Sequence, residues 1–79
     1  MTFKEAYAYA MEHSETFRRH DAKVKEAMEN REPSSCMIFS VEPEETFYYG
    51  FDGVDFHKGK HNGKRAAYLL ENEEALIIL

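Results

Sequence analysis

Turn-forming residues recur about every ten positions in the second half of the chain, and this spacing limits the folds that the chain can adopt. The Asp-Gly pair at 52–53 and the Asn-Gly pair at 62–63 are two-residue hairpin signals, because a type I′ turn needs positive φ at both central residues. Asn72 falls where a third such turn is due, and the Glu-Pro-Glu-Glu cluster at 42–45 where an earlier one is due. The spacing is typical of a meander of short strands.

The first third of the chain is predicted to be helical. Thr2 and Glu5 have the spacing of a capping box, no Gly or Pro interrupts residues 1–32, and Pro33 ends the helical region. One long helix and two shorter helices are both compatible with the pattern. A helix of about thirty residues would be roughly 45 Å long, more than so small a domain covers. We therefore favour a break near residues 12–14, with Ser14 as a second N-cap.

These patterns predict a single α+β domain over residues 1–79, helical over 2–31 and a sheet over 35–79. The sheet is expected to be a five-stranded antiparallel β-meander, covered on one face by the helical segment. Closing the three turns places seven apolar residues on the covered face: Tyr49, Phe51, Val54, Phe56, Leu69, Leu76 and Ile78. The alternative for the C-terminal part is a helix within residues 66–76, because Ala, Leu and Glu there are good helix formers.

Composition narrows the class of protein. The net charge of −5 argues against general affinity for nucleic acids and favours either solubility or a basic partner. The lone Cys36 excludes an internal disulfide and is typical of a reducing compartment. No run resembles a signal peptide or is long enough to span a bilayer. We expect a cytoplasmic protein that does not enter a membrane.

The same turn registers predict an aromatic row on the sheet face away from the helices. Tyr48, His57, Tyr68 and Ile77 stand side by side in this row, with Leu70 next to it. An exposed aromatic row indicates a protein-binding surface. Two structural alternatives are that the helices cover this face instead, or that the sheet curls into a small barrel that buries it.

Charged residues gather at the two ends of the predicted sheet. One end is acidic and is part of the predicted protein-binding site, because concentrated negative charge attracts a basic protein surface: Asp52, Asp55, Glu71, Glu73 and Glu74. The other end, the hairpin tip over residues 57–65, is basic and is the candidate for nucleic-acid contact by charge alone: Lys58, Lys60, Lys64 and Arg65.

Motifs for catalysis or metal binding are weak. Cys36 is alone in a predicted strand, and Ser34 and Ser35 lack the Gly-flanked elbow of acyl-transfer serines. Asp55, His57 and His61 alternate onto one strand face, which falls short of a converging ligand set. We therefore predict neither a cofactor nor a metal, and no enzyme activity.

The function predicted from the sequence is non-catalytic binding of another protein. Inhibition of a larger enzyme or a defence complex is the more specific hypothesis, by analogy of size and charge with phage-encoded inhibitors. Nucleic-acid contact through the basic tip is the first alternative, and a small enzyme or metal protein around His57 is the second. A homodimer is compatible with the pattern.

Overall fold

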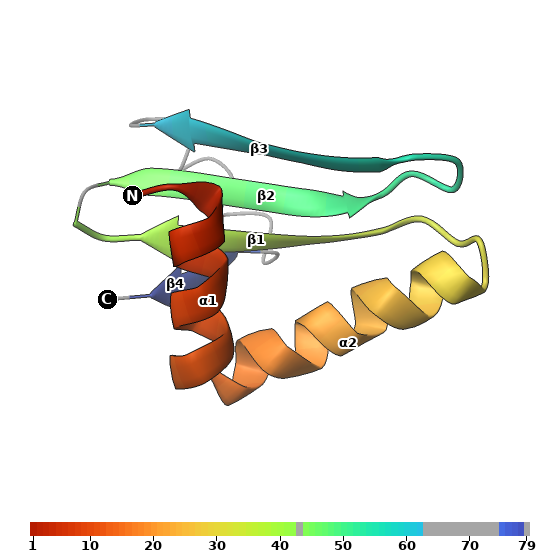
Figure 1. Ribbon diagram of the computed structural model, residues 1–79, viewed down its shortest axis with the longest axis horizontal. Coiled ribbons are helices and arrows are strands. Elements are labelled where there is room, and N and C mark those ends of the chain that lie inside the picture. The colour runs from red at the N-terminus through yellow and green to blue at the C-terminus, as the bar shows by residue number, and fades with distance from the viewer. Residues whose placement is uncertain (43, 63–74, 79) are drawn as a thin grey trace.

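The computed structural model describes residues 1–42, 44–62 and 75–78, and has an α+β architecture. Within these ranges two helices come first, followed by four strands: α1 Phe3–His13, α2 Glu15–Glu29, β1 Ser34–Ser40, β2 Glu45–Phe51, β3 Phe56–Asn62 and β4 Ala75–Ile78. The sheet order is β3-β2-β1-β4. In Figure 1, α1 crosses in front of the strands, and α2 leads away from its lower end at an angle.

The α+β layout with N-terminal helices is confirmed, whereas the five-stranded antiparallel meander is wrong. Among the described strands, only β1, β2 and β3 form an antiparallel series, and β4 instead pairs parallel with β1. The reason lies in β1, where Cys36, Met37, Ile38 and Phe39 are all buried. A strand that is apolar on both faces belongs in the middle of a sheet, not at the edge where the meander put it. The predicted fourth strand and most of the alternative helix fall outside the described residues.

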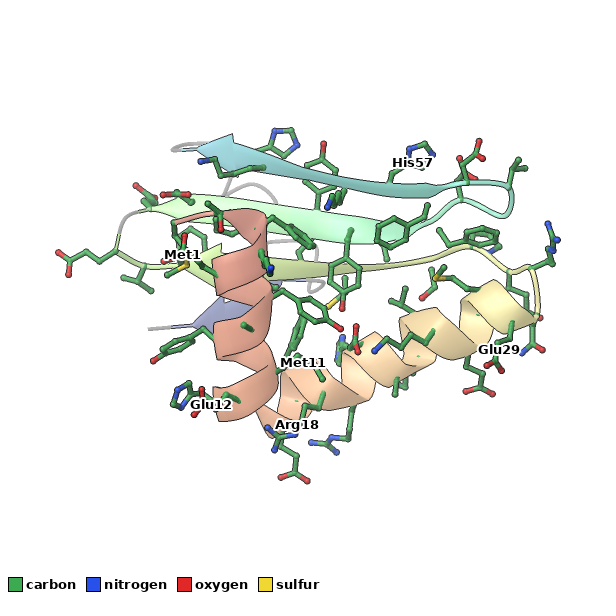
Figure 2. The ribbon with its side chains drawn as sticks, viewed as in Figure 1. Met1, Met11, Glu12, Arg18, Glu29 and His57 are labelled. Atoms are coloured by element: carbon green, nitrogen blue, oxygen red, sulfur yellow. The ribbon has the colours of Figure 1, made fainter. Side chains whose placement is uncertain are left out.

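The helical region is divided at Ser14, the position that the sequence favoured. Its backbone N–H bonds to the Ala10 carbonyl at the end of α1, and its hydroxyl accepts from the Phe17 N–H at the start of α2. Arg18 adds a second connection by donating to the Met11 carbonyl at 2.7 Å; Figure 2 shows this corner. A cation at the last carbonyls of a helix offsets its dipole. One serine and one arginine therefore fix the turn between the helices.

The hydrophobic core lies between the two helices and one face of the sheet. Alternation along β1 and β2 brings the inward-facing side chains together with those of the helices. The core cluster consists of Ala6, Ala10, Phe17, Val24, Cys36, Ile38, Phe47 and Tyr49. On the opposite face, Met37, Phe39 and Thr46 are also buried. The sheet is therefore largely covered on both faces at β1, and only the β2–β3 side is more open.

The turn after β2 is longer than the two-residue hairpin that the sequence predicts. Asp52 accepts hydrogen bonds from the N–H groups of Val54 and Asp55 at 2.8 and 2.7 Å, and Gly53 has φ 102°. The Asp52 side chain thus stabilises a four-residue turn, as Asp does in Asx-turns. Phe51 consequently pairs with Phe56 and not with Val54. This shift of two residues keeps the side chains of β2 and β3 on their predicted faces but changes every pair between these two strands, and it leaves Val54 in the turn.

The C-terminus of α2 allows a test of local backbone strain. Arg31 has φ 59°, while the Glu32 N–H bonds to the Ala27 carbonyl at 2.8 Å, which is the Schellman pattern. A non-glycine residue in this left-handed conformation costs roughly 1 kcal/mol or more. We expect Arg31→Gly to raise the free energy of unfolding by about 0.5–1 kcal/mol in urea denaturation. Arg31→Ala is the control and should give no gain; equal effects of both changes would contradict the strain.

Candidate binding site

One buried carboxylate connects both helices to the sheet. Asp21, in α2, is only 3 % exposed. Its Oδ1 accepts from the hydroxyl of Tyr7 in α1 at 2.9 Å and from that of Tyr49 in β2 at 2.7 Å. The Lys25 ammonium, one helical turn further along α2, lies 2.8 Å from Oδ2. Both carboxylate oxygens are therefore occupied by donors.

The environment of this cluster shifts the pKa of each member away from neutrality. Burial alone would raise the pKa of Asp21, but hydrogen bonds from Lys25, Tyr49 and Tyr7 outweigh burial and hold that pKa below its ordinary value. Burial and the bond to Asp21 raise the pKa of both tyrosines. The hydrogen bond to Asp21 raises the pKa of Lys25. At neutral pH the cluster thus contains a carboxylate, an ammonium and two neutral phenols.

A cleft of about 340 Å³ opens beside this cluster, and we call it the helix-side cleft. Its walls come from both helices and from the inward-facing positions of β2 and β3. Most of the lining is apolar, and four of the lining side chains are aromatic. The lining residues are Phe3, Tyr7, Asp21, Val24, Lys25, Met28, Tyr49, Phe56 and Lys58.

Aromatic rings meet at Tyr49 on the floor of the helix-side cleft. Its ring packs edge-on against Phe3 and Tyr7, with ring centres 5.8 and 5.7 Å apart, and lies 6.2 Å from the ring of Phe56. Edge-to-face pairs at these distances are favourable because the positive ring edge meets a negative ring face. The floor is therefore held by ring packing as well as by the hydrogen bond to Asp21.

Two apolar side chains at and just before the start of β3 are exposed, and one of them, Phe56, also lines the helix-side cleft. Val54 is 73 % exposed and Phe56 is 46 % exposed. The sequence predicts both as core residues, and this is wrong for a physical reason. The four-residue turn lifts Val54 out of the strands, and Phe56 begins β3, the outermost strand of the described sheet.

Lysines of β3 lie on the same sheet face as the helix-side cleft. Lys58 stands over the Phe3 ring, with its ammonium 5.3 Å from the ring centre, a favourable placement for a cation. The Lys60 ammonium lies 3.3 Å from a carboxylate oxygen of Glu45. The two described members of the predicted basic tip are thus held against different neighbours on the helix side, while Lys64 and Arg65 lie outside the described residues.

The structure rearranges the predicted aromatic row. Tyr48 lies opposite Gly59 and not opposite His57, because the turn shifts the register by two residues. The Tyr48 ring stacks on His61, with ring centres 4.8 Å apart, and covers the place where a Cβ on Gly59 would stand. Ile77 is in register with Phe39 in the β1–β4 pair. Tyr68 and Leu70 lie outside the described residues.

A second hollow, of about 180 Å³, does bring three predicted residues together. Tyr48, His57 and Asp52 all line it. Figure 2 shows His57 on β3, and its Nε2 lies 2.8 Å from the Asp52 carboxylate. Backbone donors of Asp55 and Val54, followed by His57, lower the pKa of Asp52 to about 2. Asp52 therefore holds the turn together, while Asp55 is exposed beside it and Glu71, Glu73 and Glu74 lie outside the described residues.

The described ranges give no sign of a metal centre or a membrane span. Within residues 1–42, 44–62 and 75–78, no three His, Cys, Asp or Glu side chains come close enough to hold an ion. No helix in the same ranges combines the length and apolar character needed to cross a bilayer. Comparison with protein-family models, curated proteins and solved structures finds no match.

The Asp21 cluster was not predicted from the sequence, although one signal for it is present there. Asp21 falls on the apolar face of the helical pattern, together with Tyr7 and Val24. A charged residue in that position needs polar partners in the folded protein. Tyr7 is 14 residues away in the sequence and Tyr49 is 28 residues away. Nothing local in the sequence identifies them as the partners.

The low pKa of Asp21 leads to a prediction about acid stability. A carboxyl whose pKa is lower in the folded than in the unfolded protein stabilises the fold above the unfolded pKa, about 4. That stabilisation is lost as the pH falls through the folded pKa. We expect Asp21→Asn to lower the free energy of unfolding by about 2 kcal/mol at pH 7, as removal of charged hydrogen bonds does. Urea denaturation at a series of pH values measures this difference.

The difference between Asp21→Asn and the wild type should shrink as the pH is lowered from about 5. Asp55→Asn is the control, because Asp55 is exposed at the β2–β3 turn and surface changes of this kind usually stay within about 0.5 kcal/mol. A constant difference between Asp21→Asn and the wild type at all pH values would contradict the role of the ionised carboxylate.

Proposed function

We propose that this protein is a non-catalytic module that binds another protein through the helix-side cleft and its exposed apolar margin. The observation that carries the proposal is an open apolar cleft of about 340 Å³ whose lining includes the exposed ring of Phe56. Contiguous exposed apolar surface with aromatic residues is typical of interaction sites. A cytoplasmic setting, to which the buried and reduced Cys36 is suited, belongs to the proposal.

The chemistry of the polar groups near the helix-side cleft favours binding over catalysis. An acid or base that works at neutral pH needs a pKa near 7. The pKa of Asp21 is lowered, and the pKa values of Tyr7 and Tyr49 are raised. Both shifts move the pKa values further from 7, so these groups are unsuited to proton transfer at neutral pH. A protein with such a site would act by occupying part of its partner, which is compatible with inhibition of a larger enzyme or complex.

Site-directed photo-crosslinking tests the proposed surface. The photoreactive residue p-benzoylphenylalanine replaces Phe56 at the cleft margin, or Lys23 on the exposed side of α2 as the matched control. In source cells, we expect position 56 to capture one predominant protein that position 23 does not capture. Equal capture at both positions, or none at position 56, would remove support for this surface.

Alanine substitutions give the energetic test with the captured partner. Binding energy concentrates in a few aromatic anchors, so Phe56→Ala should weaken binding by about 2 kcal/mol, or roughly 30-fold in Kd. Its effect on unfolding should stay well below the roughly 3–5 kcal/mol of a buried phenylalanine. Tyr9→Ala, at an exposed ring on the outer side of α1, is the control and should leave Kd unchanged. Isothermal titration and thermal melts measure both quantities.

A further inference from the structure

Lys58 is the charged group at the helix-side cleft for which the described residues supply no opposite charge. Lys25 lines the same cleft, but Asp21 neutralises it at 2.8 Å. In the described part of the chain, Lys58 has no carboxylate within salt-bridge distance, and its ammonium faces the Phe3 ring. The lining of the cleft therefore carries a net positive charge, although the whole chain has a charge of −5.

We propose that the helix-side cleft receives an apolar side chain that stands next to a carboxylate on the partner protein. This inference rests on the proposed function and specifies the chemistry of the segment that is bound. The apolar side chain enters between Tyr49, Phe56 and Met28, and the carboxylate pairs with Lys58 at the rim. The occupant is thus an acidic segment of the partner that also carries an aromatic or aliphatic side chain.

The lining of the helix-side cleft accounts for the apolar part of this ligand. Rings and aliphatic side chains make up most of its walls, and its volume of about 340 Å³ is at the lower end of the roughly 300–1,000 Å³ typical of ligand pockets. Burying an aromatic side chain there removes apolar area from water on both partners, which is the main source of association energy.

The charges around the helix-side cleft account for the carboxylate. Asp21 is unavailable to a cationic ligand, because Tyr7 and Tyr49 occupy one of its oxygens and Lys25 the other. A cation entering the cleft would also meet two ammonium groups. An anion meets the free charge of Lys58, so electrostatic complementarity favours an acidic partner.

The charges on β3 argue against a second copy of this chain joined edge to edge. Pairing β3 antiparallel with its own copy about Gly59 would place Lys58 opposite Lys60, and like charges directly opposite each other destabilise a strand pair. Lysines on an outer strand protect it from self-association in this way. Pairing of two copies through β3 is therefore disfavoured, and we assign the acidic segment to a different protein.

A pair of small probes that differ only in charge tests the inference on the full chain. We would titrate 4-phenylbutyrate and the neutral 4-phenylbutanamide into ¹⁵N-labelled protein and follow backbone amide shifts by NMR. Both probes should shift the amides of Tyr49, Phe56 and Lys58. The acid should bind about threefold more tightly or better at low salt, since an exposed ion pair contributes modestly, and added salt should reduce this preference.

Lys58→Met keeps an apolar stem but removes the charge, and it should abolish the preference for the acid while leaving the binding of the amide unchanged. Lys23→Met, on the exposed side of α2, is the matched control and should retain the preference. Equal affinity for both probes in the wild type would overturn the inference, as would a preference that survives Lys58→Met, or shifts confined to residues outside the cleft.

Competition separates this inference from the proposed function. Excess 4-phenylbutyrate should reduce crosslinking of the partner at position 56 more than 4-phenylbutanamide does. Undiminished crosslinking would overturn the acidic-segment inference while leaving protein binding intact. Selective binding of the acid with no captured partner at position 56 would overturn both the protein-binding proposal and the assignment of the occupant to a partner protein.

Discussion

The hydrogen-bonded carboxylate of Asp21 is the interaction on which the arrangement of the helices depends. A charge that is 97 % buried is stable only with full compensation, and here the donors come from three elements: Tyr7 of α1, Tyr49 of β2 and Lys25 of α2 itself. These bonds fix α1 and α2 relative to β2. Ser14 and Arg18 fix the corner between the two helices. Together these contacts hold apart the walls between which the helix-side cleft opens.

Local signals in the sequence predicted the helices well, because their determinants lie within a few residues of each other. The capping box at Thr2 and the N-cap at Ser14 are read directly from the chain. The partner of β1 was not predictable in this way. Its apolar run over residues 36–39 and the run over 75–78 are both typical of buried, parallel-paired strands. That signal is present in the sequence, but the regular turn spacing competes with it by predicting an antiparallel meander.

The candidate site was less predictable than the fold, because the conformation of a single turn determines which side chains are exposed. An Asp-Gly pair is compatible with a two-residue turn or with a longer turn stabilised by the Asp side chain. Asp52 forms the longer turn. The residues of β2 and β3 stay on their predicted faces of the sheet, so Tyr49 is buried on the helix side as predicted. Val54 and Phe56, in contrast, are exposed. The sequence likewise does not show that the helices leave part of the β2–β3 face open.

Tyr49 links the helix-side cleft to the stability of the whole domain. Its ring forms the floor of the cleft, and its hydroxyl donates to the carboxylate that anchors both helices. An occupant that packs against this ring binds only the folded arrangement, so binding must stabilise the fold by mass action. Because Tyr7 shares the same carboxylate oxygen, displacement of either ring also changes the hydrogen bonding of the other. One oxygen atom of Asp21 therefore connects the floor of the cleft to both helices.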